Sequence, residues 1–137
     1  MEAFPMKSPL RYLLDTHALL WAAAEEERLG PEAARILAST PYERLAISDV
    51  SLQEIGYLLH TGKVTLRGSP AAVLGPVLDY VQVLPISLQV ALAAPALRLP
   101  LGDPFDRIIA ATAKVHRLTL LSRDATLAES GQVPVVW

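Results

Sequence analysis

The chain has 137 residues, of which 52% are hydrophobic, and this is enough for one domain with a sizeable core. Twelve basic and 14 acidic residues give a formal charge of −2, which excludes a uniformly basic nucleic-acid-binding surface but allows a local basic patch. The sequence contains no cysteine, so disulfide frameworks and thiolate zinc sites are excluded. Because no apolar run is long enough to cross a bilayer, we expect a cytoplasmic protein without a membrane segment.

The predicted elements alternate between short apolar strands and helices. Residues 1–9 contain two prolines and no periodicity, which predicts an extended N-terminal leader, and we expect residues 10–137 to form a single domain. The run from Tyr12 to Leu14 predicts a buried strand that ends at Asp15, and the alanine-rich segment from Thr16 to Ala24 predicts a helix. Further strands are expected at 45–47, 81–84, 118–121 and 135–137, and further helices from Pro31, from 49 to about 60, at 71–80, at 87–94 and from Asp103 onward.

This alternation is typical of an α/β protein. Because parallel strands are joined by helical crossovers and covered on both faces, we expect a three-layer α/β/α sandwich with a mainly parallel central sheet. In such a sheet, ligands bind outside the carboxyl ends of the strands. Asp15, Ser48 and the run from Ser122 to Asp124 directly follow three predicted strands, so we expect these residues to converge on one edge of the sheet.

Two further acidic segments are placed to reach the same edge. Glu54 lies two turns into the helix that follows the second strand, on a face with Ser51 and apart from the apolar stripe that includes Leu52. Asp103 and Asp106 are three residues apart at the start of a helix and share a face. Carboxylates and water are the ligands that Mg²⁺ and Mn²⁺ prefer, so the acids together predict a divalent-metal site.

Each acid also has an ordinary structural explanation. Asp103 is followed by proline in the pattern of a helix cap, and Asp106 is then a first-turn acid that favours the helix dipole. Asp15 and Asp124 follow strands, where aspartate is common in turns, and Glu54 is expected on a partly exposed helix face. For each acid alone both interpretations stay open, and only their shared placement favours a site.

Other catalytic chemistries lack support in the sequence. The three histidines, His17, His60 and His116, form no ligand-spaced pair, and there is neither a glycine-rich phosphate loop nor a nucleophile elbow. Thr16 and Ser122 adjoin acids at strand ends, where a hydroxyl can hydrogen-bond a carboxylate, a water or a phosphate oxygen. We expect these two hydroxyls to support an acidic site.

Four segments resemble the PIN domain family, in particular the VapC-like ribonuclease toxins of prokaryotic toxin–antitoxin pairs. They are YLLDTHALLW at 12–21, ISDVSLQEI at 47–55, DPFDRIIAATA at 103–113 and LTLLSRD at 118–124. The resemblance covers about Tyr12 to Trp137 and implies a PIN-like, Rossmann-like fold. Gln53 stands where the family often has a tryptophan before the helix acid, and this difference affects packing more than chemistry.

This resemblance implies a metal-dependent endoribonuclease that hydrolyses RNA with metal-activated water. Its motif positions carry the catalytic and metal-binding roles over to four acids, Asp15, Glu54, Asp106 and Asp124. Thr16, Ser122 and Asp103 match positions beside these acids and are expected to support the site. The implied cofactor is Mg²⁺ or Mn²⁺, as one or two ions. The implied partners are RNA, a cognate antitoxin and a second copy of the chain.

Basic residues near these motifs are candidates for binding RNA phosphates, because phosphate contacts dominate nucleic-acid affinity. The candidates are Arg107, Arg123, Lys63 and Arg67, and each is equally interpreted as a solvated surface charge. Two alternatives to a nuclease stay open: a Rossmann-like acid-cluster phosphatase, and a metal- or nucleic-acid-binding module without catalysis. No second aspartate stands two residues after Asp15, which disfavours the phosphatase.

Overall fold

The computed structural model describes residues 9–100 and 102–137, so the predicted leader at 1–9 lies outside the described residues except for its last position. Within these ranges the strands are β1 (Tyr12–Leu14), β2 (Leu45–Ser48), β3 (Gln82–Leu84), β4 (Thr119–Leu121) and β5 (Val135–Val136). The helices are α1 (Thr16–Ala24), α2 (Pro31–Ser39), α3 (Asp49–His60), α4 (Pro70–Leu78), α5 (Leu88–Ala96), α6 (Pro104–His116) and α7 (Ala125–Ser130), with short 3-10 turns η1 (Glu26–Arg28) and η2 (Tyr42–Arg44).

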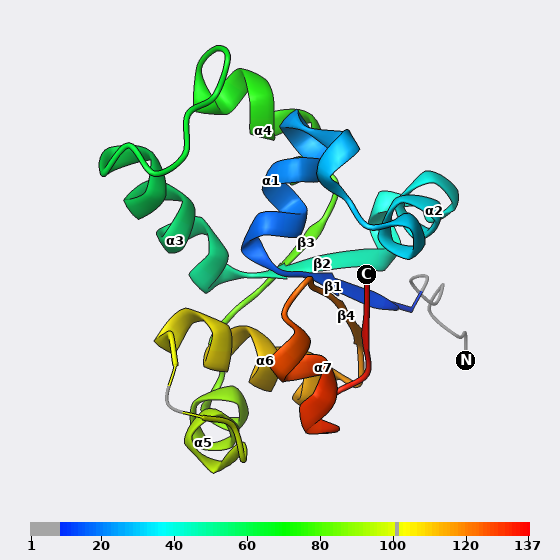
Figure 1. Ribbon diagram of the computed structural model, residues 1–137, viewed down its shortest axis with the longest axis vertical. Helices are drawn as coiled ribbons and strands as arrows, with labels where there is room; N and C mark the ends of the chain where they lie inside the picture. The colour runs from blue at the N-terminus through cyan, green and yellow to red at the C-terminus, as the bar shows by residue number, and fades with distance from the viewer. Residues whose placement is uncertain (1–8, 101) are drawn as a thin grey trace, which may run out of the picture.

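The strands form one parallel sheet in the order β3-β2-β1-β4-β5. Leu13 in β1 lies opposite Ala46 in β2 and Leu120 in β4, and all three side chains are fully buried. Strands covered on both faces bury successive side chains, which is why these segments lack polar alternation. Figure 1 shows α1, α2 and α4 on one face of the sheet and α5, α6 and α7 on the other. The predicted three-layer α/β/α sandwich is confirmed.

Side chains at the carboxyl ends of strands also begin the helices that follow. Asp15 caps α1 by accepting a hydrogen bond from the backbone N–H of Ala18, and Asp124 caps α7 by accepting one from Leu127. Ser48 caps α3 by accepting from Val50. Such a cap satisfies a backbone N–H that the helix leaves unpaired and is worth about 1 kcal/mol. The chain therefore turns into a helix directly at the edge of the sheet.

The orientation of α3 differs from the predicted one. Leu52, which was expected on a buried apolar stripe, is 40% exposed, whereas Glu54 is only 7% exposed and Ser51 is fully buried. The reason is that α3 lies against both α1 and α6, so the helix buries the face that meets them rather than its most apolar face. The expectation that Glu54 lies on a partly exposed face was wrong.

Two helical segments extend beyond the predicted elements. The helix α7 was not predicted, because its six residues are too few to show a helical period in the sequence. The helix α5 continues through Pro95 to Ala96, past the expected end at residue 94, and its backbone carbonyls near this end are satisfied by Arg107. In the described part of the chain, every helix is too short or too polar to span a bilayer.

Candidate active site

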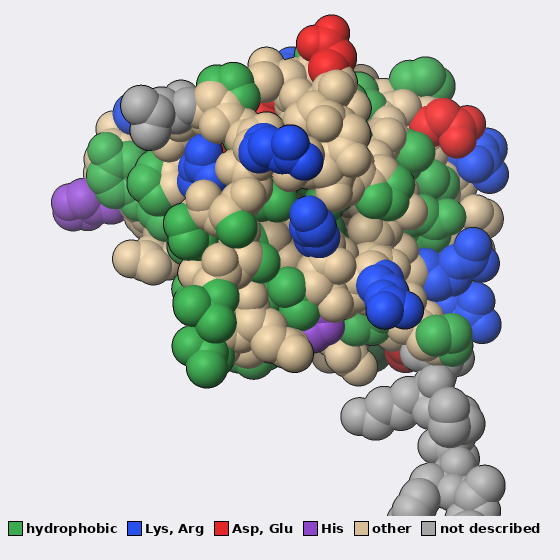
Figure 2. Space-filling view, turned by 90° about the horizontal axis from the view of Figure 1, so that it is seen from below, with side chains coloured by type: hydrophobic (Ala, Val, Ile, Leu, Met, Phe, Trp, Pro, Cys, Tyr) green, Lys and Arg blue, Asp and Glu red, His purple; other side chains and the backbone are tan. Residues whose placement is uncertain are grey.

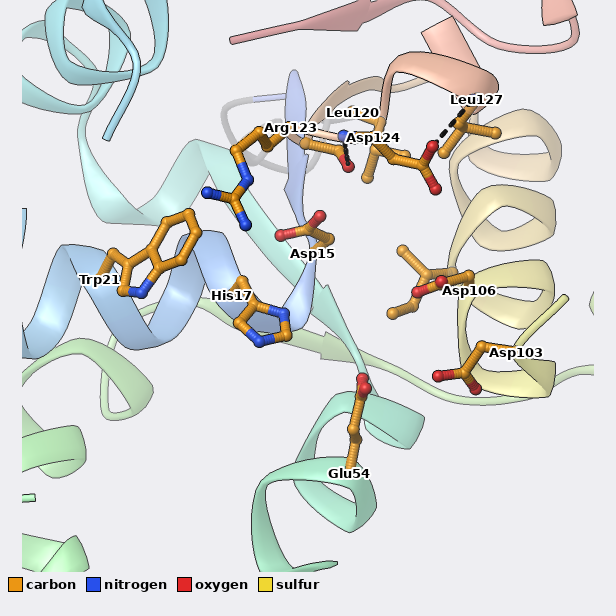
Figure 3. A pocket seen from close by; sticks show the side chains of 12 residues that line it. Asp15, His17, Trp21, Glu54, Asp103, Asp106, Leu120, Arg123, Asp124 and Leu127 are labelled. Atoms are coloured by element: carbon orange, nitrogen blue, oxygen red, sulfur yellow. Dashed lines mark hydrogen bonds between the residues drawn. The ribbon is translucent and has the colours of Figure 1, made fainter. Parts of the chain in front are cut away.

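A pocket of about 220 Å³ opens at the carboxyl ends of β1 and β4, between α1, α3, α6 and α7. Five carboxylates line it, and we call this site the acidic pocket: Asp15, Glu54, Asp103, Asp106 and Asp124. Figure 3 shows that they approach from different elements, with Glu54 rising from α3, Asp103 and Asp106 projecting from the start of α6, and Asp15 lying between them and Arg123. The structure thus brings together every acid that the sequence analysis singled out.

Asp15 and Asp124 both lie between a strand and the helix that follows it, beside the neighbouring strands β1 and β4. Asp15 directly follows β1, whereas Asp124 comes three residues after the end of β4. Each caps the next helix with one carboxylate oxygen. Ser122 accepts a hydrogen bond from the backbone N–H of Asp124 through its side-chain oxygen. Burial raises the pKa of Asp15, while hydrogen bonds from the Ser122 hydroxyl and the Ala18 N–H act in the opposite direction. The hydroxyl of Ser122 therefore contacts both segments that carry these acids.

Glu54 is held by a buried pair of hydroxyl groups. The Thr16 hydroxyl donates a hydrogen bond to Glu54 Oε1, and Ser51 Oγ lies 3.1 Å from Thr16 Oγ1. Because the only hydroxyl hydrogen of Thr16 goes to Glu54, Ser51 is the donor in its contact with Thr16. Burial raises the pKa of Glu54, and the hydrogen bond from Thr16 opposes that shift. This network orients the Glu54 carboxylate toward the acidic pocket.

Asp103 and Asp106 stand together at the start of α6. Asp103 caps the helix by accepting from the backbone N–H of Phe105 at 2.9 Å, as expected for its sequence pattern, and it also lines the acidic pocket. Desolvation inside the pocket, together with the charges of Asp103 and Glu54, raises the pKa of Asp106 to about 7. Asp106 therefore holds a proton in a large fraction of metal-free molecules at neutral pH.

The donor set of the acidic pocket suits a hard divalent cation. Its ionisable donors are carboxylates, apart from His17 at its rim. Among the described residues, no three His, Asp or Glu side chains converge closely enough to hold one ion as they stand. Mg²⁺ commonly uses one or two carboxylates and keeps several waters, so carboxylates and water together fit such an ion here. Burial and mutual repulsion raise the pKa values of Asp15, Glu54 and Asp106. A bound cation would stabilise the ionised carboxylates and so lower these pKa values again.

The four basic residues predicted to bind phosphate are placed very differently. Arg123 lines the acidic pocket, whereas Lys63 and Arg67 are exposed side chains that line two neighbouring hollows. The guanidinium of Arg107 donates hydrogen bonds to the backbone carbonyls of Ala94, Leu97 and Leu99. Arg107 thus ties the end of α5 and the segment after it to α6.

Two pocket residues were not singled out as site residues. His17 and Trp21, both on α1, line the acidic pocket, and their rings lie 5.5 Å apart. Trp21 is only 5% exposed and resembles an ordinary core residue in the sequence. Their spacing from Asp15 was the one sequence feature that pointed to them. His17 and Trp21 lie two and six positions after this strand-end acid, within the first two turns of the helix that follows it.

The fold and the acidic pocket define the class of this protein: an α/β sandwich that presents carboxylates at the carboxyl edge of a parallel sheet. The chain belongs to the PIN domain family, whose profile matches residues 12–131. The resemblance inferred from the four sequence segments is therefore confirmed.

Several known proteins are similar to this chain. Ribonuclease VapC22 of Mycobacterium tuberculosis is 32% identical over 116 residues, which are 84% of this chain and 88% of that protein. The structure of FitAcB from Neisseria gonorrhoeae matches with a TM-score of 0.66 and 26% identity, over 92% of this chain and 96% of that one. VapBC2 from Rickettsia felis, solved with a DNA fragment from its promoter, matches with a TM-score of 0.68 over 93% and 98% of the two chains; at 18% identity this likeness concerns the fold alone.

Proposed function

We propose that this protein is an endoribonuclease that depends on Mg²⁺ or Mn²⁺ and acts as the toxin of a toxin–antitoxin pair. The observation that carries the proposal is the acidic pocket, in which five carboxylates from four chain segments meet at the edge where a parallel α/β sheet binds ligands. Membership of the PIN domain family and similarity to a ribonuclease support the choice of RNA as substrate.

Four of these acids are proposed to hold one or two divalent ions: Asp15, Glu54, Asp106 and Asp124. When bound, such an ion would neutralise phosphate charge and help water to lose a proton. Asp106 must release its own proton before it can act as a ligand, because its pKa in the metal-free protein is about 7. Thr16 and Ser51 keep Glu54 oriented, while Ser122 supports Asp15 and Asp124, so the hydroxyls act as positioning residues.

The phosphodiester bond is proposed to break by in-line attack of water. Asp103 completes the anionic wall of the pocket and at the same time fixes the start of α6, so it supports Asp106. Arg123 is the only guanidinium of the described residues that lines the acidic pocket, and it is proposed to bind a substrate phosphate oxygen. The carboxylates of the pocket repel the RNA backbone, and one arginine does not balance their charge. The backbone would therefore bind there only when metal cations neutralise the carboxylates.

The protein partners proposed for this chain are an antitoxin and a second copy of itself, acting in the cytoplasm. The solved structures it matches include toxin–antitoxin complexes, among them one from Klebsiella pneumoniae at 27% identity. An antitoxin that covers the acidic pocket would block cleavage. A homodimer would sediment at twice the mass of one chain at micromolar concentration.

The direct test is cleavage of a mixed pool of single-stranded RNA with Mg²⁺, with Mn²⁺ or with a chelator. We expect the wild-type chain to cut RNA only when a divalent ion is present, and we expect Asp106→Asn to lose this activity while remaining folded. Arg35→Ala is a suitable control, because Arg35 is exposed and pairs with Glu32 on α2. Cleavage that survives the chelator, or that Asp106→Asn leaves intact, would contradict the proposal. RNA binding without cleavage would support the non-catalytic alternative.

A further inference from the structure

A second hollow, of about 320 Å³, adjoins the acidic pocket between α1 and the segment that follows α3. We call it the basic hollow, because the side chains of Arg28, Lys63 and Arg123 line it. His17, Trp21 and Arg123 line both sites, so the two are continuous. In Figure 3 the guanidinium of Arg123 lies between the ring of Trp21 and Asp15, at the boundary of the acidic pocket.

The ring of Trp21 holds two guanidinium groups in the basic hollow. The Cζ atoms of Arg28 and Arg123 lie 4.8 and 4.9 Å from the ring centroid, within the range of cation–π attraction. The ring itself is fixed, because it is 5% exposed and packs against His17 and against Trp137 at 5.6 Å. A rigid aromatic side chain therefore keeps two positive charges close together, although they repel each other.

Positive charge in the basic hollow exceeds the negative charge that balances it. Of the residues that the structure describes, Glu25 is the one carboxylate in its lining, and it pairs with Arg28 at 3.4 Å. Within residues 9–100 and 102–137, Lys63 and Arg123 form no salt bridge. The Nζ of Lys63 lies 5.4 Å from the ring centroid of Tyr57. Three cations beside one carboxylate are suited to an anion.

We infer that the basic hollow binds a phosphate of the RNA that neighbours the phosphate in the acidic pocket. The identity of this ligand rests on the proposed function. A base cannot stack on Trp21, because its ring is buried and guanidinium groups lie against it, so the backbone is the recognised part. The acidic pocket repels RNA, and the adjoining cations offset that repulsion on one side of the bond that is cut.

Lys and Arg side chains are also present on the face seen in Figure 2, some of them side by side toward one edge and the others separated by hydrophobic and neutral groups. With a formal charge of −2, the whole chain offers no general attraction for RNA. We therefore expect the basic hollow to determine which of the two phosphates that flank the cut bond must be charged for efficient RNA cleavage.

The test uses short RNA substrates that contain a mapped cleavage site and one uncharged methylphosphonate linkage, placed in turn on either side of that site. We expect one neighbouring position to lower the kcat/KM of wild type about tenfold, since a charge-assisted contact is lost. In Arg28→Ala and Lys63→Ala the same linkage should cost little, because its partner is already absent. The matched controls are Arg35→Ala, which has the same i,i+3 glutamate pairing as Arg28, and Lys114→Ala, another exposed lysine.

Equal penalties in the hollow variants and in the controls would overturn the inference. A second measurement separates it from the proposed function: tryptophan fluorescence titration with the same RNA in chelator, where no cleavage is expected. Here we expect Arg28→Ala and Lys63→Ala to weaken binding several-fold and the controls to leave it unchanged. Binding that depends on the basic hollow without metal-dependent cleavage would refute the proposed function alone. No RNA binding, or binding that none of the variants weakens, would refute the inference.

Discussion

The acidic pocket and the basic hollow share one wall, yet different interactions build them. Three acids of the pocket, Asp15, Asp103 and Asp124, are fixed by backbone hydrogen bonds because they are also helix caps. The cations of the hollow lie on long, exposed side chains, two of them against a single aromatic ring. The backbone thus fixes where negative charge is placed, whereas side-chain packing fixes where positive charge is placed.

This difference predicts different responses to mutation. Substitutions in the acidic pocket should lower the rate of RNA cleavage and, where the residue also caps a helix, the stability of that helix. Changes in the basic hollow should affect RNA affinity and its salt dependence while the fold stays intact, because Arg28 and Lys63 are exposed. The following predictions test this contrast in order of decreasing effect.

The largest effect is expected from Asp15→Asn. We expect metal-dependent RNA cleavage to fall by at least about 100-fold, because even outer-shell partners of a metal contribute about 10–100-fold. Thermal unfolding should change little, because asparagine caps a helix about as well as aspartate does. Cleavage and unfolding measured on the same preparation check both parts. Cleavage within tenfold of wild type would show that Asp15 is only a cap.

The next effect concerns pH. Because Asp106 has a pKa of about 7 without metal, its proton must leave before an ion binds. We expect Mn²⁺ affinity, measured by calorimetry, to fall by about tenfold per pH unit below 7 and to level off above it. The Asp106→Asn variant should bind more weakly throughout and lose this step. A wild-type affinity that is flat between pH 5 and 7 would contradict the assignment.

The same shift affects the stability of the metal-free protein. Between the ordinary pKa of 3.8 and the raised value of about 7, the folded state keeps a proton that the unfolded state has lost. The free energy of unfolding should therefore fall as pH rises through this window and change no further above it. Asp106 is desolvated on the side that faces the pocket, but its side chain is still accessible to solvent, so screening reduces the size of the change. Thermal unfolding of Asp106→Asn in chelator should show a weaker pH dependence than wild type.

A smaller effect is expected at Thr16, which acts through Glu54. Replacing Thr16 with valine keeps the shape but leaves a buried carboxylate without its donor, which costs about 1–3 kcal/mol of stability. Cleavage should fall by about tenfold, as for other outer-shell partners of a metal site. Thr16→Ser should restore most of both, because it returns the hydroxyl. If valine and serine behave alike, the hydroxyl has no role in orienting Glu54.

Features of the site that depend on neighbouring residues were predictable from the sequence. A strand-end acid that caps the next helix, as at Asp15, involves contacts within three residues, and the same holds for Asp103 and its helix. The alternation of apolar strands and helices likewise determines the layers of the sandwich, since each strand has to be covered on both faces.

Features that depend on distant residues were not predictable in this way. Glu54 is buried where α3 packs against α1 and α6, and Thr16, 38 positions earlier, donates a hydrogen bond to it. Helix periodicity carries no information about that pairing. The basic hollow depends on Arg28 and Arg123 meeting the ring of Trp21, and Arg123 comes from a part of the chain distant from the other two. Likewise, helix periodicity carries no information about the contacts of Arg107 with backbone carbonyls at the end of α5 and in the segment after it.

The smallest effect is expected for Lys63→Ala, measured as the salt dependence of RNA binding in chelator. Each phosphate contact with a single strand contributes about 0.7 to the slope of log affinity against log salt concentration, so the variant should lose about that much. Lys114→Ala removes the same charge from an exposed position on α6 that lines neither site, so its slope should match wild type. If both variants lower the slope equally, overall charge rather than the basic hollow determines RNA affinity. A loss confined to Lys63→Ala would place a phosphate in the basic hollow, next to the acidic pocket in which the bond is cut.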